Sequence, residues 1–310
     1  MRGSGLRPVP AAAAAVDRLL YRSALVAVGA WRCPRDHPLF GDSGPIRNHC
    51  VTFPRTAAVI QHAGGEPCLA DATVVDLYNA GQEYRRLPVS PLGAQCDYFA
   101  FAPDLLRAAV RFHDPARADT ASRLFALQQV AGSAGLYLRQ RQVFRAVESG
   151  EPDPLWIEER VVALLDAVLG AAYGQRPCAD REGSARRRAA LADRARRVLA
   201  EHLADRLPLA DLAEKLSCSP FHLCRAFRER TGRTLHGYRV QLRLRTALER
   251  LEDGADVTTV ALEVGFSSHS HITAAFRAAF GVTPTRFARL GRRARGLFRA
   301  RSGPGRSPGS

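Results

Sequence analysis

The residues whose types and spacing suggest chemistry lie in two short segments of the C-terminal part. The first opens on Ser219-Pro220, a typical helix start, because Ser accepts a hydrogen bond from a free backbone N–H and Pro suits the first helical position. Helical spacing leaves one set of residues facing outward at this end: Ser219, Phe221, His222, Cys224 and Arg225. A guanidinium can bond both O6 and N7 of guanine. This helix is therefore predicted to read DNA bases, with Arg225 as its main contact.

The second segment repeats this layout further along the chain. It turns at Gly265-Phe266 and restarts at Ser267-Ser268. Its outward positions, also predicted to face bases, are His269, Ser270, His271 and Ala274. Arg228 and Arg277 lie further along the two helices, where phosphates are nearer than base edges. The two segments predict two DNA-reading helices, each with a phosphate contact.

The elements that must position these residues form a tandem repeat. Three positions match at an offset of 48 and five at an offset of 49: Leu209, Ala213 and Leu216 with Val257, Ala261 and Val264; Leu223, Phe227, Gly232, Thr234 and Tyr238 with Ile272, Phe276, Gly281, Thr283 and Phe287. Each copy of the repeat is predicted to form a helix, a turn and a second helix. The one-residue difference between the two offsets falls in the turn. Residues 238–251 predict one long connecting helix, which would hold the two reading helices about 34 Å apart, one DNA turn. One chain is therefore expected to read a non-palindromic site in double-stranded DNA.

The charge of the chain is concentrated in the same part. The net charge is +15 over 310 residues. Residues 1–180 hold 19 Arg and 18 acidic residues, whereas residues 181–310 hold 25 Arg, one Lys and 12 acidic residues. A near-neutral half joined to a basic half indicates a sensing part and a part that binds a polyanion. A large non-basic half also argues against an architectural nucleic-acid binder without regulation.

The near-neutral half predicts a β domain followed by helices. Short apolar runs broken by Pro, Gly and Asp, such as Cys50–Phe53 and Thr73–Tyr78, favour an all-β sandwich or barrel over 21–112. A helical segment over 113–178 follows, with one helix face through residues 124–138 and a second helix from Pro154. We expect 1–20 and the basic tail 292–310 to be disordered, 179–186 to be a linker, and 187–291 to be the DNA-binding domain. The predicted fold class is mixed α and β with two domains.

The cysteines and the apolar segments limit the compartment. The seven Cys form no CxxC pair, and their odd number speaks against a disulfide framework. No stretch approaches the roughly 20 apolar residues that span a bilayer, and no signal-peptide core is present. The cytoplasm is therefore the expected location, with no membrane partner and no cofactor.

The C-terminal motifs resemble those of the AraC/XylS family of bacterial transcription regulators. The matching residues include Leu212-Ala213, His222-Leu223, Phe227-Arg228, Thr231-Gly232, Val264-Gly265-Phe266, Phe276-Arg277, Phe280-Gly281 and Pro284. The resemblance implies a seven-helix domain over about residues 190–291, promoter binding, and RNA polymerase as a partner. It also implies base contacts by Phe221, Cys224 and Arg225 in the first unit. In the second unit Ala274 stands where some members carry a cation, which predicts more phosphate anchoring than base reading there.

The N-terminal half resembles, more weakly, the cupin-like sensor of this family. The resemblance rests on Asn79–Arg85 and on Cys96–Phe101. It implies a cupin-like β-barrel that binds a small-molecule effector and takes part in a homodimer. Whether the helices between 120 and 173 form a dimer interface or pack on the barrel stays open, as does activation against repression.

Two alternatives concern metals and thiols. An enzymatic cupin needs clustered His ligands, but His37, His49 and His62 are dispersed, so no metal site is predicted. An alkylation sensor needs four close thiolates, which the Cys spacing does not suggest. Cys33, His49 and Cys96 still allow a redox or metal switch, and oxidation of Cys224 on the reading helix would block DNA binding.

Overall fold

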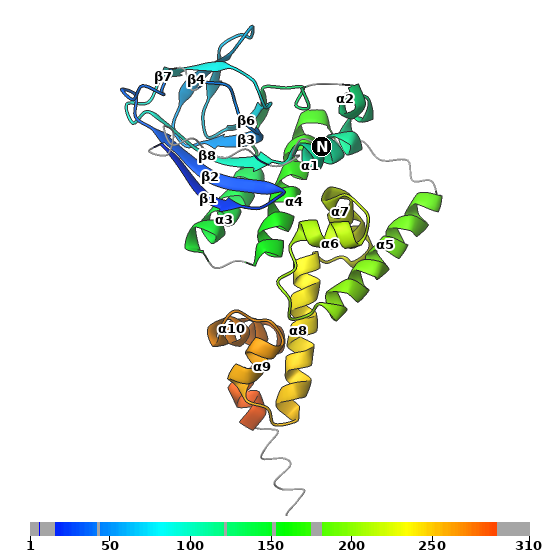
Figure 1. Cartoon of the computed structure of the whole chain (residues 1–310). Helices are drawn as coiled ribbons and strands as arrows, with labels where there is room; N and C mark the ends of the chain where they lie inside the picture. The colour runs from blue at the N-terminus through cyan, green and yellow to red at the C-terminus, as the bar shows by residue number, and fades with distance from the viewer. Residues whose placement is uncertain are drawn as a thin grey trace, which may run out of the picture.

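The computed structural model describes residue 6 and residues 16–41, 44–120, 123–150, 153–174 and 182–289. Figure 1 shows a β-rich N-terminal part with helices packed against it, and an all-helical C-terminal part that extends away from it. The mixed α and β class predicted from the sequence is confirmed. Within the described residues, no helix has the length and apolar character that crossing a membrane requires.

The β part consists of two antiparallel sheets. The larger sheet has the strand order β1-β2-β8-β3-β6-β9, and the smaller has the order β5-β4-β7. The strands are β1 (Asp17–Arg22), β2 (Val26–Cys33), β3 (His49–Pro54), β4 (Ala58–His62), β5 (Cys68–Ala70), β6 (Val74–Tyr78), β7 (Tyr84–Pro88), β8 (Ala94–Phe101) and β9 (Gln129–Ala131). Among the described residues the two sheets are not closed into one barrel by hydrogen bonds, so the cupin-like barrel is not established.

The central strands of the larger sheet are buried on both faces, which explains their nearly continuous apolar runs. Val28 and Phe99 point to the face that the helices cover. Ala27 and Ala100 are also buried, on strands where successive side chains alternate between the faces. The larger sheet thus separates the helices from the space beneath the smaller sheet.

Four helices follow the strands: α1 (Pro103–His113), α2 (Pro115–Thr120), α3 (Ala134–Ser149) and α4 (Pro154–Tyr173). Two boundaries differ from the sequence prediction. β1 begins at Asp17, inside the segment expected to be disordered, and α1 begins before the predicted end of the β domain at residue 112. The predicted start of α4 at Pro154 agrees with the structure.

The helix predicted through residues 124–138 was wrong in its first half. Residues 129–131 form β9, which pairs with β6, and the helix begins only at Ala134. The buried Asn79 explains the difference. Its side-chain amide donates to the carbonyl of Phe125 at 3.0 Å, and its Oδ1 accepts from the N–H of Phe125 at 2.9 Å. These tertiary bonds hold the segment in an extended form that apolar spacing alone does not reveal.

The C-terminal part contains α5 (Glu182–Glu201), α6 (Leu209–Lys215), α7 (Pro220–Thr231), α8 (Leu235–Glu252), α9 (Val257–Glu263) and α10 (His269–Phe280), and residues 284–289 are helical as well. Helices α6 and α7 form one helix-turn-helix unit, and α9 and α10 form the other. The long connecting helix predicted over 238–251 is α8. In Figure 1 the two units lie at different ends of α8.

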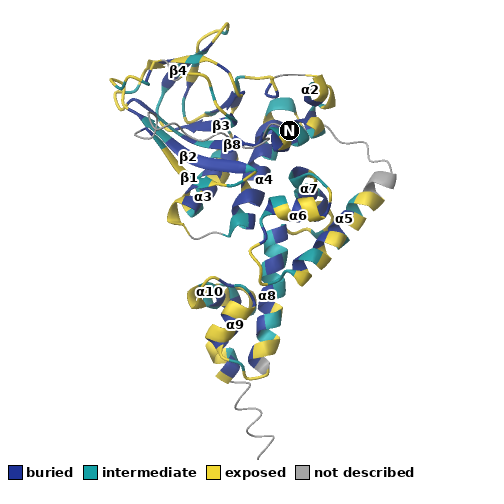
Figure 2. Cartoon of the chain, in the orientation of Figure 1, coloured by how far each residue is buried: buried dark blue, intermediate teal, exposed yellow. Residues whose placement is uncertain are grey.

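The two units belong to different hydrophobic cores. The core beneath the larger sheet continues through α4 into the first unit and includes Phe221 and Phe227. The second unit has a separate core around Val260, Ile272 and Phe276. Figure 2 shows the corresponding buried band from the sheet through α4 to α7. The first unit is therefore packed into the N-terminal part, whereas the second has its own core and packs against α8.

Candidate nucleic-acid interface

The two predicted reading helices begin and end in the same way. Ser219 Oγ accepts from the N–H of His222 at 3.2 Å, and Ser268 Oγ accepts from the N–H of His271 at 3.1 Å. Each helix ends at a glycine in the left-handed region, Gly232 at φ 66° and Gly281 at φ 74°. Glycine adopts this conformation without a steric penalty. The repeat seen in the sequence is therefore a repeat of local structure.

The predicted contact residues of the second unit lie on an open surface. His269, Ser270, Ala274 and Arg277 are exposed on α10. His271 is half-buried: its Nδ1 lies 3.1 Å from Ser267 Oγ, and its ring meets the edge of Phe266. The helix presents its first turns to solvent, as a helix that enters a major groove must.

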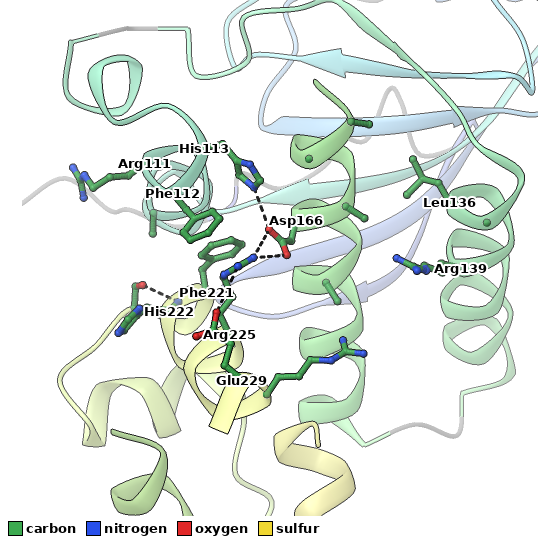
Figure 3. Close-up of a pocket in the computed structure, with 18 of the residues that line it drawn as sticks. Arg111, Phe112, His113, Leu136, Arg139, Asp166, Phe221, His222, Arg225 and Glu229 are labelled. Carbon is green, nitrogen blue, oxygen red and sulfur yellow. Dashed lines mark hydrogen bonds and ion pairs between the residues drawn. The ribbon is translucent and has the colours of Figure 1, made fainter. Parts of the chain in front are cut away.

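The predicted contact residues of the first unit are turned toward the N-terminal part instead. Arg225 Nη1 donates to both carboxylate oxygens of Asp166 on α4, at 3.0 and 2.8 Å. The same guanidinium stacks on Phe112 of α1, with its central carbon 3.8 Å from the ring centroid. His113 Nε2 lies 3.1 Å from Asp166 on the other side. Figure 3 shows this group of side chains between α1, α4 and α7.

The neighbouring residues of the first unit are covered as well. Phe221 is only 2% exposed, and its ring lies 6.2 Å from that of Phe112. Cys224 is half-buried, and burial, with a contribution from Glu159 and Glu158, raises the pKa of its thiol well above the ordinary value. Because the thiolate is the reactive form, this environment opposes the oxidation of Cys224 that we considered from the sequence. Among the predicted contact residues of the first unit, only His222 and Arg228 are exposed.

A cleft of about 1140 Å³ lies beside this contact, between α1, α3, α4 and α7. Arg111 and Arg139 line it from the N-terminal side, and Ser219, His222 and Arg228 line it from the first unit. The first turns of α7 therefore face another part of the same chain. A DNA major groove cannot receive this face while α1 and α4 occupy it.

Helix α4 also supplies hydrogen-bond acceptors to the first unit. Glu158 accepts from the N–H of Leu209 at 2.6 Å, where α6 begins. Glu159 accepts from the N–H groups of Leu235 and His236 at 2.6 and 2.8 Å, where α8 begins. These N–H groups have no partner within their own helices. Burial raises the pKa of Glu159 to about 7, while the N–H groups of His236 and Leu235 act in the opposite direction.

An ion pair completes this contact. Arg239 on α8 is fully buried, and its Nη2 donates to both oxygens of Asp153 at 2.7 and 2.6 Å. Asp153 also caps α4 by accepting from the N–H of Leu155. The start of α4 and the middle of the C-terminal part are therefore joined by charge as well as by apolar packing.

Sequence reasoning missed the partners of the first unit. Phe112, Asp153 and Asp166 carry no motif, and they meet α7 and α8 only through the tertiary fold. One signal was present: Asp166 is the single charged residue in the run Val161–Ala172, on a helix face that is otherwise apolar. A carboxylate in such a place needs a charged partner. The identity of that partner follows only from the structure.

The metal switch of Cys33, His49 and Cys96 considered from the sequence is not assembled. Across the strand pairing, His49 lies opposite Phe101, five residues along β8 from Cys96. At about 3.3 Å per residue this separates them by roughly 16 Å, too far for a shared ion. The described residues contain no group of three or more His, Cys, Asp or Glu side chains suited to hold a metal.

Comparison with known proteins identifies the C-terminal part. Residues 212–290 match the family model of a helix-turn-helix domain. Over 74 residues the chain is 36% identical to an uncharacterized helix-turn-helix transcriptional regulator of Bacillus subtilis, YbfI. That match covers 24% of this chain and 27% of the relative, so the chain matches only about a quarter of the relative's length.

Several solved structures are also similar. The C-terminal domain of AraT, a response regulator from Geobacillus stearothermophilus, is 27% identical, with 32% of this chain and 84% of that chain covered and a TM-score of 0.31. A Chromobacterium violaceum regulator with an AraC-type DNA-binding domain is 23% identical over 40% of this chain and all of that chain, with a TM-score of 0.31. ToxT from Vibrio cholerae is 11% identical over 86% of this chain and 96% of that chain, with a TM-score of 0.35.

These TM-scores are low, and the assignment therefore rests on the sequence matches and on the motifs. The repeated unit defines the class as a helix-turn-helix protein. Residues 212–290 form a helix-turn-helix domain of the AraC type, as the motifs predicted.

Proposed function

We propose that this protein is a sequence-specific DNA-binding regulator of transcription that reads double-stranded DNA with both helix-turn-helix units. The observation that carries the proposal is the pair of matched units, with the same Ser caps and the same glycine ends, mounted on the single helix α8. In this class the first turns of the second helix enter the major groove. The two units would occupy successive grooves on one face of the duplex.

The roles of the side chains follow from their chemistry. Arg225 would read a guanine through its two-pronged guanidinium, with Phe221 and Cys224 beside it. His269, Ser270 and His271 would face bases from the second unit, where Ala274 offers only a methyl group. Arg228 and Arg277 are exposed further along their helices and would bind phosphates.

The contact between α7 and α4 leads us to propose a resting state. In the described arrangement Asp166 accepts two hydrogen bonds from Nη1 of Arg225, one of the nitrogens with which the residue would bind a guanine, and Phe112 covers the face of the guanidinium. Sequence-specific binding by the first unit therefore requires separation of α7 from α1 and α4. An effector bound to the N-terminal part would control this separation. RNA polymerase and a second copy of the chain are further proposed partners, and the helices over 113–178 are the proposed dimer surface.

The proposal is tested by selecting preferred DNA sequences in vitro with the full-length chain. We expect the wild type to select a site in two parts, about one helical turn apart. Arg225→Ala should relax the preference at one base pair, at a cost of about 1–3 kcal/mol in discrimination, whereas His271→Ala should mainly weaken overall affinity.

Arg225→Ala also releases Asp166, and Asp166→Ala serves as the matched control. The control should bind more tightly without any change in the preferred bases. An unchanged preferred site in Arg225→Ala would exclude this residue from base reading. If neither the wild type nor the Asp166→Ala variant selects a DNA sequence, the proposed function is overturned.

A further inference from the structure

The space between the two sheets is a cavity of about 570 Å³, far from the α7 contact and on the other face of the larger sheet. Both sheets line it, with Trp31 from β2, Asp76 from β6, and Tyr84 and Arg86 from β7. Its volume lies in the range of small-molecule sites. Much of its wall is apolar and includes Leu39, Ile46, Ala58, Ile60 and Ala70.

One cation in this cavity, Arg86, is buried and interacts with the carboxylate of Asp76 only at longer range, without a direct ion pair among the described residues. Arg86 is only 6% exposed. Its Nη2 donates to the hydroxyl oxygen of Tyr84 at 2.7 Å, but its Nη1 has no hydrogen-bond partner. Within the described part of the chain no carboxylate forms an ion pair with it. A guanidinium stays charged in a protein, and burying an unpaired charge is costly. Such a group is expected to be matched by an anion when the cavity is filled.

The surroundings of Arg86 specify the shape of that anion. The guanidinium lies 5.5 Å from the ring centroids of Trp31 and Tyr84 and 5.7 Å from that of Phe40. The indole Nε1 of Trp31 is a second buried donor without a partner. Two unused N–H donors beside flat aromatic walls suit a carboxylate on a flat apolar body.

Two carboxylates in the cavity wall, Asp76 and Asp17, favour a ligand with a single negative charge. Asp76 is buried and is held by Gln129 Nε2 at 2.8 Å and by Thr52 Oγ1 at 3.4 Å. Asp17, which accepts from the Tyr98 hydroxyl at 2.7 Å, is a second carboxylate in the wall. Phosphate esters would bring a double charge close to these two groups. A monocarboxylate brings one charge, which matches the guanidinium of Arg86 with its unused Nη1.

We propose that the cavity binds a small aromatic monocarboxylic acid, with its carboxylate on Arg86 Nη1 and Trp31 Nε1 and its ring between the aromatic walls. The inference rests on the proposed function only in making this acid the effector. Strand β2 carries Trp31 on the cavity side and Val28 in the core shared with α1 and α4. A ligand in the cavity would therefore be separated from the helices that hold α7 by a single strand, β2.

The test measures binding of phenylacetate and indole-3-acetate to the full-length protein by isothermal titration calorimetry, each against its neutral amide. We expect both acids to bind at least tenfold more tightly than phenylacetamide and indole-3-acetamide. Arg86→Gln should weaken acid binding at least tenfold, and Trp31→Phe should weaken it several-fold while keeping a ring in place. Arg85→Gln is the matched control, because Arg85 is the adjacent residue of β7 and is exposed.

Several outcomes separate the site from the proposed function. Equal affinity for acids and amides, no binding of either acid at millimolar concentration, or unchanged binding in a folded Arg86→Gln variant would overturn the site. Trp31→Phe decides the matter if Arg86→Gln does not fold, since unchanged acid binding in that variant would also remove the site. Acid binding that leaves DNA affinity unchanged would reject only the effector role. Acid binding by a chain that selects no DNA would reject only the proposed function.

Discussion

The two helix-turn-helix units differ less in their sequences than in what surrounds them. Both begin at a Ser cap and end at a left-handed glycine, and the second helix buries four apolar residues in the first unit and two in the second. The first unit shares its core with the N-terminal part, and its predicted reading residues bind α1 and α4. The second has its own core and open first turns. Two units with the same motif therefore differ in how accessible their second helices are to DNA. The contact that covers the first unit is where regulation can act.

The caps of the supporting helices show the same contrast. In the second unit, α9 is capped by its own Asp256, an exposed carboxylate whose pKa is lowered by the N–H groups of Thr259 and Thr258. In the first unit, α6 follows Pro208, which offers no side-chain cap, and Glu158 of α4 accepts the N–H of Leu209 instead. The second unit supplies the cap of its first helix from its own sequence. The first is completed by the N-terminal part.

The largest expected difference concerns the buried ion pair of the first unit. The repeat aligns Arg239 with Ala288 of the second unit, which is buried in an apolar core. Arg239→Ala leaves Asp153 without its partner and should destabilise the N-terminal part and the first unit by about 3–5 kcal/mol. Denaturant unfolding followed by circular dichroism measures this change. The exposed pair of Arg250 and Glu263 provides the control, and Arg250→Ala should cost no more than about 1 kcal/mol. Equal losses of stability in Arg239→Ala and Arg250→Ala would contradict the idea that the first unit alone depends on a buried ion pair.

The next effect is a dependence of stability on pH that Glu159 confers. Burial raises its pKa from 4.5 to about 7, so between these values the folded chain keeps a proton that the unfolded chain has lost. Stability from this group is therefore fully present below pH 4.5 and is lost as the pH rises through about 7. Relative to Glu159→Gln, the wild type should lose up to about 3 kcal/mol of unfolding free energy between pH 5 and pH 8.

The Asp256 cap confers a dependence of stability on pH that has the opposite sign to that of Glu159. Its pKa is lowered, so its stabilisation is present above the ordinary pKa of 3.8 and is lost as the pH falls below it. Relative to Asp256→Asn, the wild type should lose stability only in acid. The two pairs of unfolding curves check both signs. If the difference in unfolding free energy between the wild type and Glu159→Gln does not change with pH, the buried Glu159 carboxylate at the start of α8 is contradicted.

A smaller effect is expected on DNA affinity. Asp166→Ala removes the carboxylate that holds Arg225 and should favour the separated state by about 1–2 kcal/mol, which is roughly a tenfold gain in affinity. Fluorescence anisotropy with the selected DNA gives the dissociation constants. Asp119 on α2 forms an exposed ion pair with Arg111 on α1, and Asp119→Ala, which breaks this pair, should leave DNA affinity unchanged. If both variants bind as the wild type does, the contact does not restrain the first unit.

The smallest effect concerns one phosphate contact of the second unit. Arg277→Ala should lower affinity without any change in the preferred bases, and it should reduce the slope of log affinity against log salt by about 1. Anisotropy titrations at several salt concentrations measure this slope. A change in base preference with an unchanged slope would assign Arg277 to base reading and would give the second unit a larger part in specificity.

The local structure of the C-terminal part was predictable from the sequence because caps, turns and apolar spacing are local signals. Ser219, Gly232 and the 48- and 49-residue offsets specified both units and the connecting helix. The extended segment before α3 was not predictable, since its form depends on two hydrogen bonds from Asn79, far away in the sequence. The pairing of Arg225 with Asp166 was hidden for the same reason. Outward-facing residues of a helix look the same in sequence whether they face DNA, solvent or another domain.

The accessibility of Cys224 tests the central claim most directly, because this thiol lies in the covered face of α7. Its rate of alkylation by iodoacetamide in the DNA-free, full-length chain is compared, by mass spectrometry of each peptide, with the rate at position 274 in an Ala274→Cys variant, the open equivalent of Arg225. We predict slow alkylation at Cys224, rapid alkylation at position 274, and a marked rise at Cys224 alone when Asp166→Ala is added. Equal and rapid alkylation at both positions in the otherwise unaltered chain would contradict a first unit held closed by the N-terminal part.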